Sequence, residues 1–146
     1  MKIIVHNIRS LYNVGAFFRN ADAFGVSHIY LSGYTATPPR LEISKTALGA
    51  DETISWSKHE DVLELIDELK AENERVYAFE SDPSFVHLDQ VKPDHDAVLI
   101  FGNEPDGLAT DILDRASERV YIPMRGEKTS LNVSVASGIA LYAMSL

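Results

Sequence analysis

The chain has 146 residues, 45% of them apolar, which is enough for one domain with a sizeable core. It contains no Cys, no apolar run near the roughly 20 residues of a membrane span and no signal-peptide pattern at its N-terminus, so we expect a cytoplasmic protein without disulfides, thiol catalysis or Cys-based zinc sites. Its 13 basic and 22 acidic residues give a net charge of −9, which disfavours tight nonspecific binding to nucleic acid.

The negative charge is concentrated in the middle of the chain. Residues 50–100 contain four basic and 14 acidic residues, whereas residues 1–49 contain five basic and two acidic residues, a net charge of +3. The N-terminal third can therefore still offer a small phosphate-facing surface. No internal repeat, Pro-rich linker or low-complexity tract divides the chain, and we expect a single domain over residues 1–146.

The first half of the chain alternates predicted strands with predicted helices. Strands are expected at residues 2–6, 27–31 and 53–56, and helices at residues 14–24 and 43–48. Asn13 is placed to cap the first helix, and Gly25 is placed to end it. Arg19 projects from the middle of that helix, away from its apolar stripe.

The second half of the chain repeats this alternation. The periodicity predicts helices at residues 60–72 and near 111–116, and strands at residues 75–80, 97–101 and 119–122. The run A-V-L-I-F at 97–101 has no polar alternation, which is typical of a strand covered on both faces. Together these elements predict an open, mostly parallel α/β sheet with helices on both faces, which binds ligands where its strands end at their carboxyl edge.

A last helix is expected after Ser130, which is placed as its N-cap. Leu131, Val135, Ile139 and Tyr142 recur on one face at helical spacing, and no charged residue follows position 128. An outer face without charges predicts that this helix is buried almost all round, against its own domain and against a second chain.

Three loops at strand ends carry candidate site residues. The first, residues 7–19, surrounds a helix N-terminus, which suits an anion. The second, residues 102–108, has two glycines for close backbone approach, and its Glu104 can accept hydrogen bonds or help to bind a cation. The third is residues 122–132. Taken singly, each loop also has an ordinary structural interpretation: a helix cap with solvated arginines for the first, a tight strand-to-helix turn for the second and a capped helix start for the third. The polar side chains of the first loop are those of Asn7, Arg9, Ser10, Asn13 and Arg19.

Several chemistries are disfavoured because their motifs are missing. The five His are scattered, without a pair at ligand spacing, so no metal site is expected. The sequence has no G-x-G-x-x-G after a strand, no G-x-x-x-x-G-K-[ST] and no G-x-S-x-G. A standard dinucleotide site, a nucleoside-triphosphate loop and a serine hydrolase are therefore not expected.

Taken together and in this order, the three loops resemble the three motifs of the SpoU (TrmH-like) family of SPOUT RNA methyltransferases. The matching segments are N-x-R-S-x-x-N-V-G-A-x-x-R-x-A-D-A-F-G at residues 7–25, F-G-N-E-P-D-G-L at 101–108 and I-P-M-x-G-x-x-x-S-L-N-V-S-V-A at 122–136. The resemblance implies methyl transfer from S-adenosylmethionine to a ribose 2′-hydroxyl of tRNA or rRNA, without a metal. It also implies a trefoil knot in the C-terminal part of the α/β domain, and a homodimer formed through the C-terminal helix.

The resemblance further implies roles for individual residues. The methyl-donor contacts fall on the backbone around Gly102, Ile122 and Leu131, with the strand end at Phe79 and Glu80 as a further contributor. The implied catalytic positions are Arg19, Asn13, Glu104, Ser130 and Asn132.

The role of Arg19 is constrained by its chemistry. Arginine does not lose its proton in ordinary protein environments, so we expect Arg19 to fork onto an RNA phosphate and the attacking ribose rather than to act as a base. No separate RNA-binding domain is evident in the sequence, so RNA contacts are expected from dispersed cations. These are Arg9, Arg19, Arg40, Lys45, Arg125 and Lys128.

Two other functions fit part of the sequence. A non-catalytic module that binds S-adenosylmethionine and RNA in a regulatory role is favoured by the acidic balance, whereas the presence of Arg19, Asn13 and Asn132 favours the enzyme. A flavodoxin-like small-ligand domain explains the expected sheet and leaves the order of the three motifs unexplained.

Overall fold

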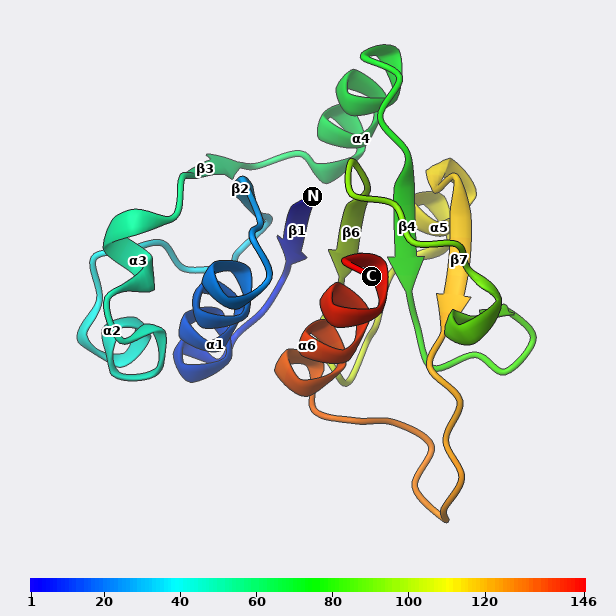
Figure 1. Cartoon of the computed structure of the whole chain (residues 1–146). Helices are drawn as coiled ribbons and strands as arrows, with labels where there is room; N and C mark the ends of the chain where they lie inside the picture. Colours follow the sequence, from blue (N-terminus) through cyan, green and yellow to red (C-terminus); the bar gives the residue numbers. More distant parts are fainter.

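In the computed structural model, residues 1–146 form one sheet of seven parallel strands with helices packed against it (Figure 1). The strands are β1 (Lys2–His6), β2 (His28–Ser32), β3 (Trp56–His59), β4 (Val76–Phe79), β5 (Val86–His87), β6 (Val98–Phe101) and β7 (Glu118–Tyr121). They lie in the order β3-β2-β1-β6-β4-β7-β5, and every neighbouring pair is parallel. The predicted open, parallel α/β sheet is therefore confirmed.

The centre of the sheet joins segments that are far apart in the sequence. β1 lies between β2 and β6, so Lys2 is opposite His28 on one side and opposite Val98 on the other. β6 is buried along its whole length, as its unbroken apolar run predicts. Because all strands are parallel, the carboxyl ends of β6, β4 and β7 meet at one edge of the sheet.

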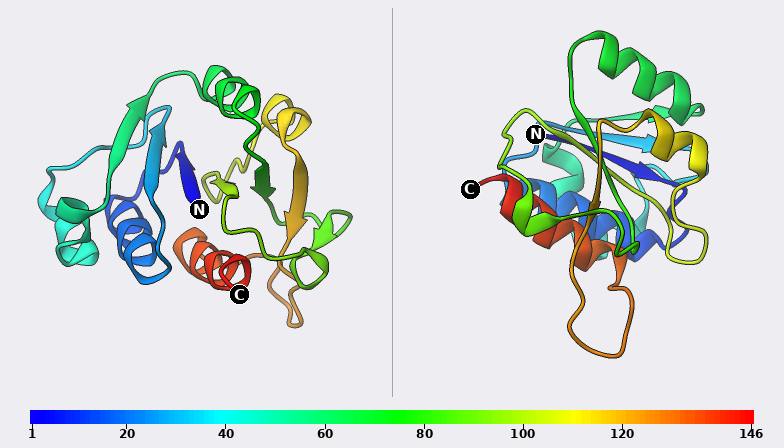
Figure 2. Two further views of the ribbon diagram at one scale, coloured as in Figure 1. Left: turned by 45° about the horizontal axis from the view of Figure 1, so that its top comes forward. Right: turned by 90° about the vertical axis from the view of Figure 1, so that its right-hand side faces the viewer.

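Helices cover both faces of the sheet. They are α1 (Leu11–Ala23), α2 (Leu41–Ala47), α3 (Ala50–Thr53), α4 (Val62–Ala71), α5 (Thr110–Arg115) and α6 (Val133–Met144), with a 3-10 turn η1 (Leu88–Gln90). α1 and α6 lie side by side on one face, and α4 and α5 lie on the other (Figure 2). The first face covers a cluster of 24 buried apolar residues and the second a cluster of 11, so the main core lies beneath α1 and α6. None of the helices combines the length and the apolar character that a membrane span requires.

The first helix begins earlier than predicted. α1 starts at Leu11, and its N-cap is Ser10 rather than Asn13, because the Ser10 Oγ accepts a hydrogen bond from the Asn13 backbone N–H at 3.2 Å. Ser and Asn are equally good caps, so residue type alone does not decide between them. The side chain of Asn13, not being the cap, is available for a contact with another element.

The last helix begins later than predicted. α6 starts at Val133, and its N-cap is Asn132 rather than Ser130. The Asn132 Oδ1 accepts hydrogen bonds from the backbone N–H of Ser134 at 2.9 Å and from its hydroxyl at 2.6 Å. Ser130 therefore stays in the loop before the helix.

The third strand is also displaced from its predicted position. β3 pairs with β2 from Trp56 onwards, opposite Ile29, whereas Thr53 is the last residue of α3. The local hydrogen bond from the Ile54 N–H to the Ala50 carbonyl, at 2.9 Å, keeps this segment helical. The predicted strand at 53–56 is therefore wrong in its first residues. The stretch 81–96, for which no element was predicted, contains β5 and η1.

Within the single chain the last helix is buried on one side only, and its predicted burial against a second chain stays a prediction. The outer face of α6 leaves 51% of Val135, 40% of Ile139 and 57% of Tyr142 exposed. The side of α6 that faces the core combines small residues with the large side chains of Leu141 and Met144. The buried residues of α6 are Val133, Ser137, Ala140, Leu141 and Met144.

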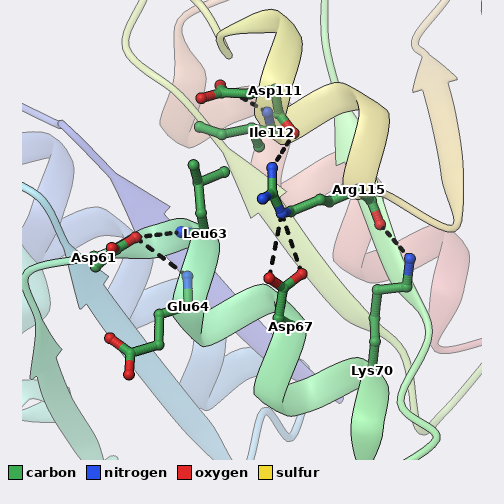
Figure 3. Close-up of polar contacts among 8 residues, drawn as sticks. All are labelled: Asp61, Leu63, Glu64, Asp67, Lys70, Asp111, Ile112 and Arg115. Atoms are coloured by element: carbon green, nitrogen blue, oxygen red, sulfur yellow. Dashed lines mark hydrogen bonds and ion pairs between the residues drawn. The ribbon is translucent and has the colours of Figure 1, made fainter.

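The helix predicted at 60–72 is α4, and its outer surface carries charged residues that contact a second helix (Figure 3). Asp61 caps α4 by accepting hydrogen bonds from the backbone N–H groups of the first turn. The Arg115 Nε of α5 pairs with the Asp67 Oδ1 of α4 at 3.1 Å, and the Lys70 Nζ donates to the Arg115 carbonyl at 2.7 Å. These polar contacts join α4 to α5 far from the start of α6.

Candidate functional site

A cleft of about 590 Å³, a volume that includes its open mouth, lies where β4, β6 and β7 end beside the start of α6. Its inner wall is aromatic, with the rings of Phe79 and Phe101 stacked at a centroid distance of 5.1 Å. An apolar wall with a rim of backbone polar groups suits a flat, partly polar ligand. The lining residues are Phe79, Glu80, Ser81, Phe101, Gly102, Asn103, Glu104, Tyr121, Ile122, Met124, Ser130, Leu131, Val133 and Ala136.

The loop after β6 forms a tight turn at one edge of the cleft. The Asn103 carbonyl accepts a hydrogen bond from the Gly107 N–H at 2.9 Å, and the Asn103 Oδ1 accepts another from the Asp106 N–H at 2.8 Å. Gly107 has a positive φ of 62°. A Cβ on Gly102 would lie 2.7 Å from the Gly107 carbonyl oxygen, so only glycine fits there without a shift of the backbone.

Glu104 connects this loop to the C-terminal helix. Its Oε1 accepts a hydrogen bond from the Val133 N–H, the first residue of α6, at 3.0 Å. The carboxylate therefore holds two of the three sequence motifs at a fixed separation. Of the two roles considered for Glu104, this contact is the acceptance of a hydrogen bond. No group of three His, Cys, Asp or Glu side chains in the chain is arranged to hold a metal ion.

Asn132 and Asn13 connect the C-terminal helix to the first motif. Besides capping α6, Asn132 donates from its Nδ2 to the Asn13 Oδ1 at 3.4 Å. Two turns further along α1, the Asn20 Nδ2 donates to the Ser134 carbonyl at 2.8 Å and to the Ser137 Oγ at 2.9 Å. Asn132 and Ser137 thus have side-chain partners on α1, whereas the hydroxyl of Ser134 bonds within its own helix end, to Asn132.

Glu80, at the end of β4, is an acidic residue in the cleft wall. Its Oε1 accepts a hydrogen bond from the Leu108 N–H at 3.1 Å, and Gly107 leaves no room for a Cβ beside the carboxylate. Burial raises the pKa of Glu80, while the hydrogen bonds from the backbone of Leu108 and Ser81 partly oppose that rise. The position of Glu80 at a carboxyl strand end is the signal in the sequence that points to the site.

The structure brings most of the candidate residues to one cleft. Gly102, Glu104, Ile122, Ser130 and Leu131 all line it, although residues 102 and 131 are far apart in the sequence. Asn132 and Asn13 are joined to each other beside it. Ser81, Asn103 and Met124 also line the cleft and were not singled out as site residues. Asn103 and Met124 lie within the quoted motifs, whereas Ser81 lies in none of them.

The basic residues are not part of this cleft. Arg19 is exposed on α1 and is absent from the cleft lining, so the structure does not bring it into the cleft of its own chain. Arg40 and Lys45 are exposed at the two ends of α2, and Arg125 is exposed in the loop before α6. The Arg9 guanidinium carbon lies 5.6 Å from the ring centroid of Tyr34. None of these cations takes part in an ion pair.

The sequence is similar to RNA methyltransferases over nearly its whole length. The model of the SpoU rRNA Methylase family matches residues 1–142. The tRNA (guanosine(18)-2'-O)-methyltransferase of Aquifex aeolicus is 31% identical over 144 residues, which cover 96% of this chain and 66% of that protein. The 23S rRNA (guanosine-2'-O-)-methyltransferase RlmB of Vibrio vulnificus is 29% identical over 140 residues, which cover 96% of this chain and 56% of that protein.

The fold is similar to solved structures of such proteins. The A. aeolicus TrmH/SpoU tRNA modifying enzyme matches with a TM-score of 0.88 and 28% identity, covering 98% of this chain and 72% of that one. An AdoMet-bound rRNA methyltransferase from Sinorhizobium meliloti matches with a TM-score of 0.90 and 28% identity, covering 98% of this chain and 54% of that one. The present chain spans only 56–66% of the length of the sequence relatives named above.

Proposed function

This chain belongs to the SpoU rRNA methylase family, and from that premise we propose that it transfers a methyl group from S-adenosylmethionine to a ribose 2′-hydroxyl of tRNA or rRNA. The observation that carries the proposal is the convergence of the second and third motifs, with the end of β4, on one cleft. The tRNA and rRNA methyltransferases to which the chain is similar support the substrate class. We propose that it acts in the cytoplasm, where these RNAs are available.

The cleft fits the methyl donor by the character of its walls. The stacked rings of Phe79 and Phe101 offer an apolar surface for the adenine, and Gly102 lets the backbone approach it without a side chain between them. The backbone at Ile122 and Leu131 supplies polar groups on the opposite wall. When bound, S-adenosylmethionine supplies an electrophilic methyl group on a sulfonium centre. No metal is needed for this arrangement.

The protein groups around the cleft then act by positioning. Glu104 fixes the start of α6 through the Val133 N–H, and Asn132 fixes the same helix end against Asn13. Attack by the ribose oxygen requires it to be aligned with the methyl carbon and the sulfur, so a shift of these loops by about 1 Å is expected to slow the reaction strongly. Ser130, in the exposed part of the loop, is placed to contact the incoming nucleotide.

Arg19 is proposed to act on the RNA from outside the cleft. It is exposed and has no acidic partner, so its fork of donors is available for a phosphate and for the attacking ribose hydroxyl. The other dispersed cations extend the same contact to the RNA backbone, although the chain as a whole carries a net charge of −9. They are Arg9, Arg40, Lys45, Arg125 and Lys128.

We also propose a homodimer through α6. Its exposed face is uncharged and consists of Val135, Ile139 and Tyr142. The Tyr142 ring contacts the Phe24 ring at the end of α1 edge to face, at a centroid distance of 6.2 Å, so the apolar surface extends to α1. Sedimentation equilibrium on the wild-type protein and on Ile139→Asp tests this: the variant is expected to be monomeric. A wild-type protein that sediments as a monomer at all accessible concentrations contradicts the proposed dimer.

The test of the enzyme is Arg19→Lys, which keeps the charge and loses the fork. We expect kcat to fall by about tenfold or more with unmodified tRNA and rRNA and labelled donor, because a forked contact is lost, while the Kd of the donor measured by calorimetry stays the same. Glu104→Gln is expected to lower kcat while the melting temperature changes little. Near-wild-type turnover of Arg19→Lys contradicts the forked contact.

A second candidate is a module that binds S-adenosylmethionine and RNA without transferring the methyl group. It is favoured by the net charge of −9 and by the position of Arg19 outside the cleft of its own chain. Incubation of pooled tRNA and rRNA with labelled donor separates the two functions. The module binds the donor and leaves the RNA unlabelled, whereas the enzyme labels it.

A further inference from the structure

Tyr34, in the loop after β2, is an exposed aromatic residue that is held at three points. Its backbone N–H donates to the Asn7 Oδ1 at 3.0 Å, its hydroxyl accepts from the Asn103 Nδ2 at 2.7 Å, and the Arg9 guanidinium carbon lies 5.6 Å from its ring centroid. The residue nevertheless leaves 49% of its surface exposed. A ring that is fixed before binding loses little freedom when a ligand stacks on it, so these contacts favour binding.

The loop that carries Tyr34 is itself held in place. Gly33 has a φ of 62°, and a Cβ on it would lie 1.9 Å from the Asn7 Oδ1. The Lys58 Nζ donates to the carbonyl oxygens of Gly33 and Thr35 at 2.5 and 2.6 Å. The hydroxyl of Thr35 is buried and bonds to the backbone of β1 and of the loop that follows β1. The exposed ring therefore stands on a rigid support.

The position of Tyr34 is next to the donor cleft and outside it. Asn103 lines the cleft and bonds to the Tyr34 hydroxyl, so the ring lies one side chain away from the proposed donor site. Arg9 lies over the same ring, and its charge is not balanced by any ion pair in the chain. A nucleotide at this place meets an aromatic surface and a cation beside the reaction site.

Resting on the proposed function, we propose that Tyr34 and Arg9 form a nucleotide-binding platform for the substrate RNA, with the Tyr34 ring stacked on a nucleobase and Arg9 bound to a phosphate. Proteins that recognise unpaired RNA commonly stack its bases on aromatic side chains, and the bases of loops and bulges are available for this. The adenine of the methyl donor is the other source of a nucleobase. Because Tyr34 does not line the cleft, the RNA is the occupant that the structure favours.

The test compares Tyr34→Ala, Tyr34→Leu and Tyr34→Phe with the wild-type protein. Fluorescently labelled, unmodified tRNA transcripts and 23S rRNA fragments report the Kd of the RNA, and calorimetry reports the Kd of S-adenosylmethionine. Loss of one stacked base is expected to weaken RNA binding about tenfold in the Ala and Leu variants. The Phe variant keeps the ring and is expected to restore binding to within about twofold of the wild type. The Kd of the donor is expected to be the same in all four proteins, and KM for RNA to rise more than kcat falls.

Three results overturn the platform. Equal RNA binding by Tyr34→Ala and the wild type shows that no base stacks there. A Phe variant as weak as the Ala variant shows that the hydroxyl acts through Asn103 on the loop, which is a structural role. A donor Kd that weakens together with RNA binding assigns the ring to the adenine of the donor. If the wild-type protein itself binds neither donor nor RNA, both the proposed function and the platform are contradicted. If the wild type binds both and only the results of the Tyr34 variants differ from those expected, the platform alone is contradicted.

Discussion

The two faces of the sheet are covered by paired helices that are joined by different kinds of contact. Between α4 and α5, the ion pair of Arg115 and Asp67 lies on the surface, with side chains 37% and 60% exposed (Figure 3). Between α1 and α6, the amide of Asn20 donates to Ser134 and Ser137 in a partly buried contact, and no ion pair is present. The first pair of helices is joined by charges that water can replace, and the second by polar groups that water cannot easily reach.

This difference shows where the geometry of the site is determined. An exposed ion pair contributes about 0–1 kcal/mol, so α4 and α5 tolerate its loss. A buried polar group that loses its partner costs about 1–3 kcal/mol, so the packing of α6 on α1 depends on a few amides and hydroxyls. The start of α6, with Val133 and Ala136, forms part of the cleft wall, and α1 holds that helix in place. Changes there are expected to affect function, and changes on the α4–α5 face to affect it little.

The largest expected effect is that of Gly102→Ala in the cleft wall. The added Cβ would lie 2.7 Å from the Gly107 carbonyl, so the turn must move, at a cost of about 1–3 kcal/mol of unfolding free energy. We expect donor binding to weaken about 100-fold or more, as measured by calorimetry, because the displaced backbone occupies the cleft.

The matched control for that change is Gly138→Ala in α6. The nearest atom to its added Cβ belongs to Asn20, at an ordinary contact distance of 3.5 Å. We expect donor binding to be retained and the helix to gain up to about 1 kcal/mol from the better helix propensity of Ala. Equal donor affinity in the two variants contradicts the proposed position of the donor beside Gly102.

A second pair of variants tests the comparison of the two faces directly. Asn20→Ala removes the amide that joins α1 to α6 and is expected to lower the unfolding free energy by about 1–3 kcal/mol in urea denaturation. Asp67→Ala removes the surface ion pair between α4 and α5 and is expected to lower it by less than about 1 kcal/mol. Weaker donor binding is expected only for Asn20→Ala, because α6 forms one wall of the cleft. If Asp67→Ala is the more damaging change, the comparison of the faces is wrong.

The smallest expected effect is a pH dependence from His6, at the carboxyl end of β1. Burial lowers the pKa of this imidazole, although the charge of Asp111 partly opposes the shift. As the pH falls through 6.5, the unfolded chain takes up a proton on this imidazole, whereas the folded chain resists it. His6 therefore lowers the free energy of unfolding on the acidic side of pH 6.5 and has no effect on it at higher pH.

His6→Asn isolates that contribution. Asn keeps a polar group near the Ser32 hydroxyl, which lies 2.9 Å from the His6 Nδ1, and does not titrate. Urea denaturation between about pH 5 and 8 is expected to show the wild type losing stability relative to the variant only as the pH falls through the ordinary histidine range. Parallel stability curves for the two proteins would show that His6 has an unshifted pKa.

Patterns in the sequence predict the sheet well and the ends of elements less well. The unbroken apolar run at 97–101 identifies β6 as a covered strand, because only such a strand omits polar alternation. Ser10 and Asn13 are both good caps, and only the path of the chain decides which of them is used. The order of the strands requires pairings that local patterns do not contain.

The sequence motifs predict only part of the site. Glu104 was recognised as polar and near a strand end, whereas its bond to the Val133 N–H depends on the approach of two distant segments. The position of Arg19 outside the cleft was not predicted. The helical spacing predicts on which face of α1 this side chain lies, but it does not predict which other elements of the chain lie beside that face. The trefoil knot stays a prediction that follows from the resemblance.

The central position of β1 has a consequence for the nascent protein. β1 is synthesised before β6, with which it pairs, Val98 lying opposite Lys2. At about 5–20 residues per second, a ribosome needs roughly 5–20 s to make the intervening chain. During that interval the apolar residues Ile3, Ile4 and Val5, which are fully buried in the finished sheet, have no neighbour on one side. Chaperones that bind exposed apolar segments are expected to associate with the β1 segment until residue 101 has left the exit tunnel.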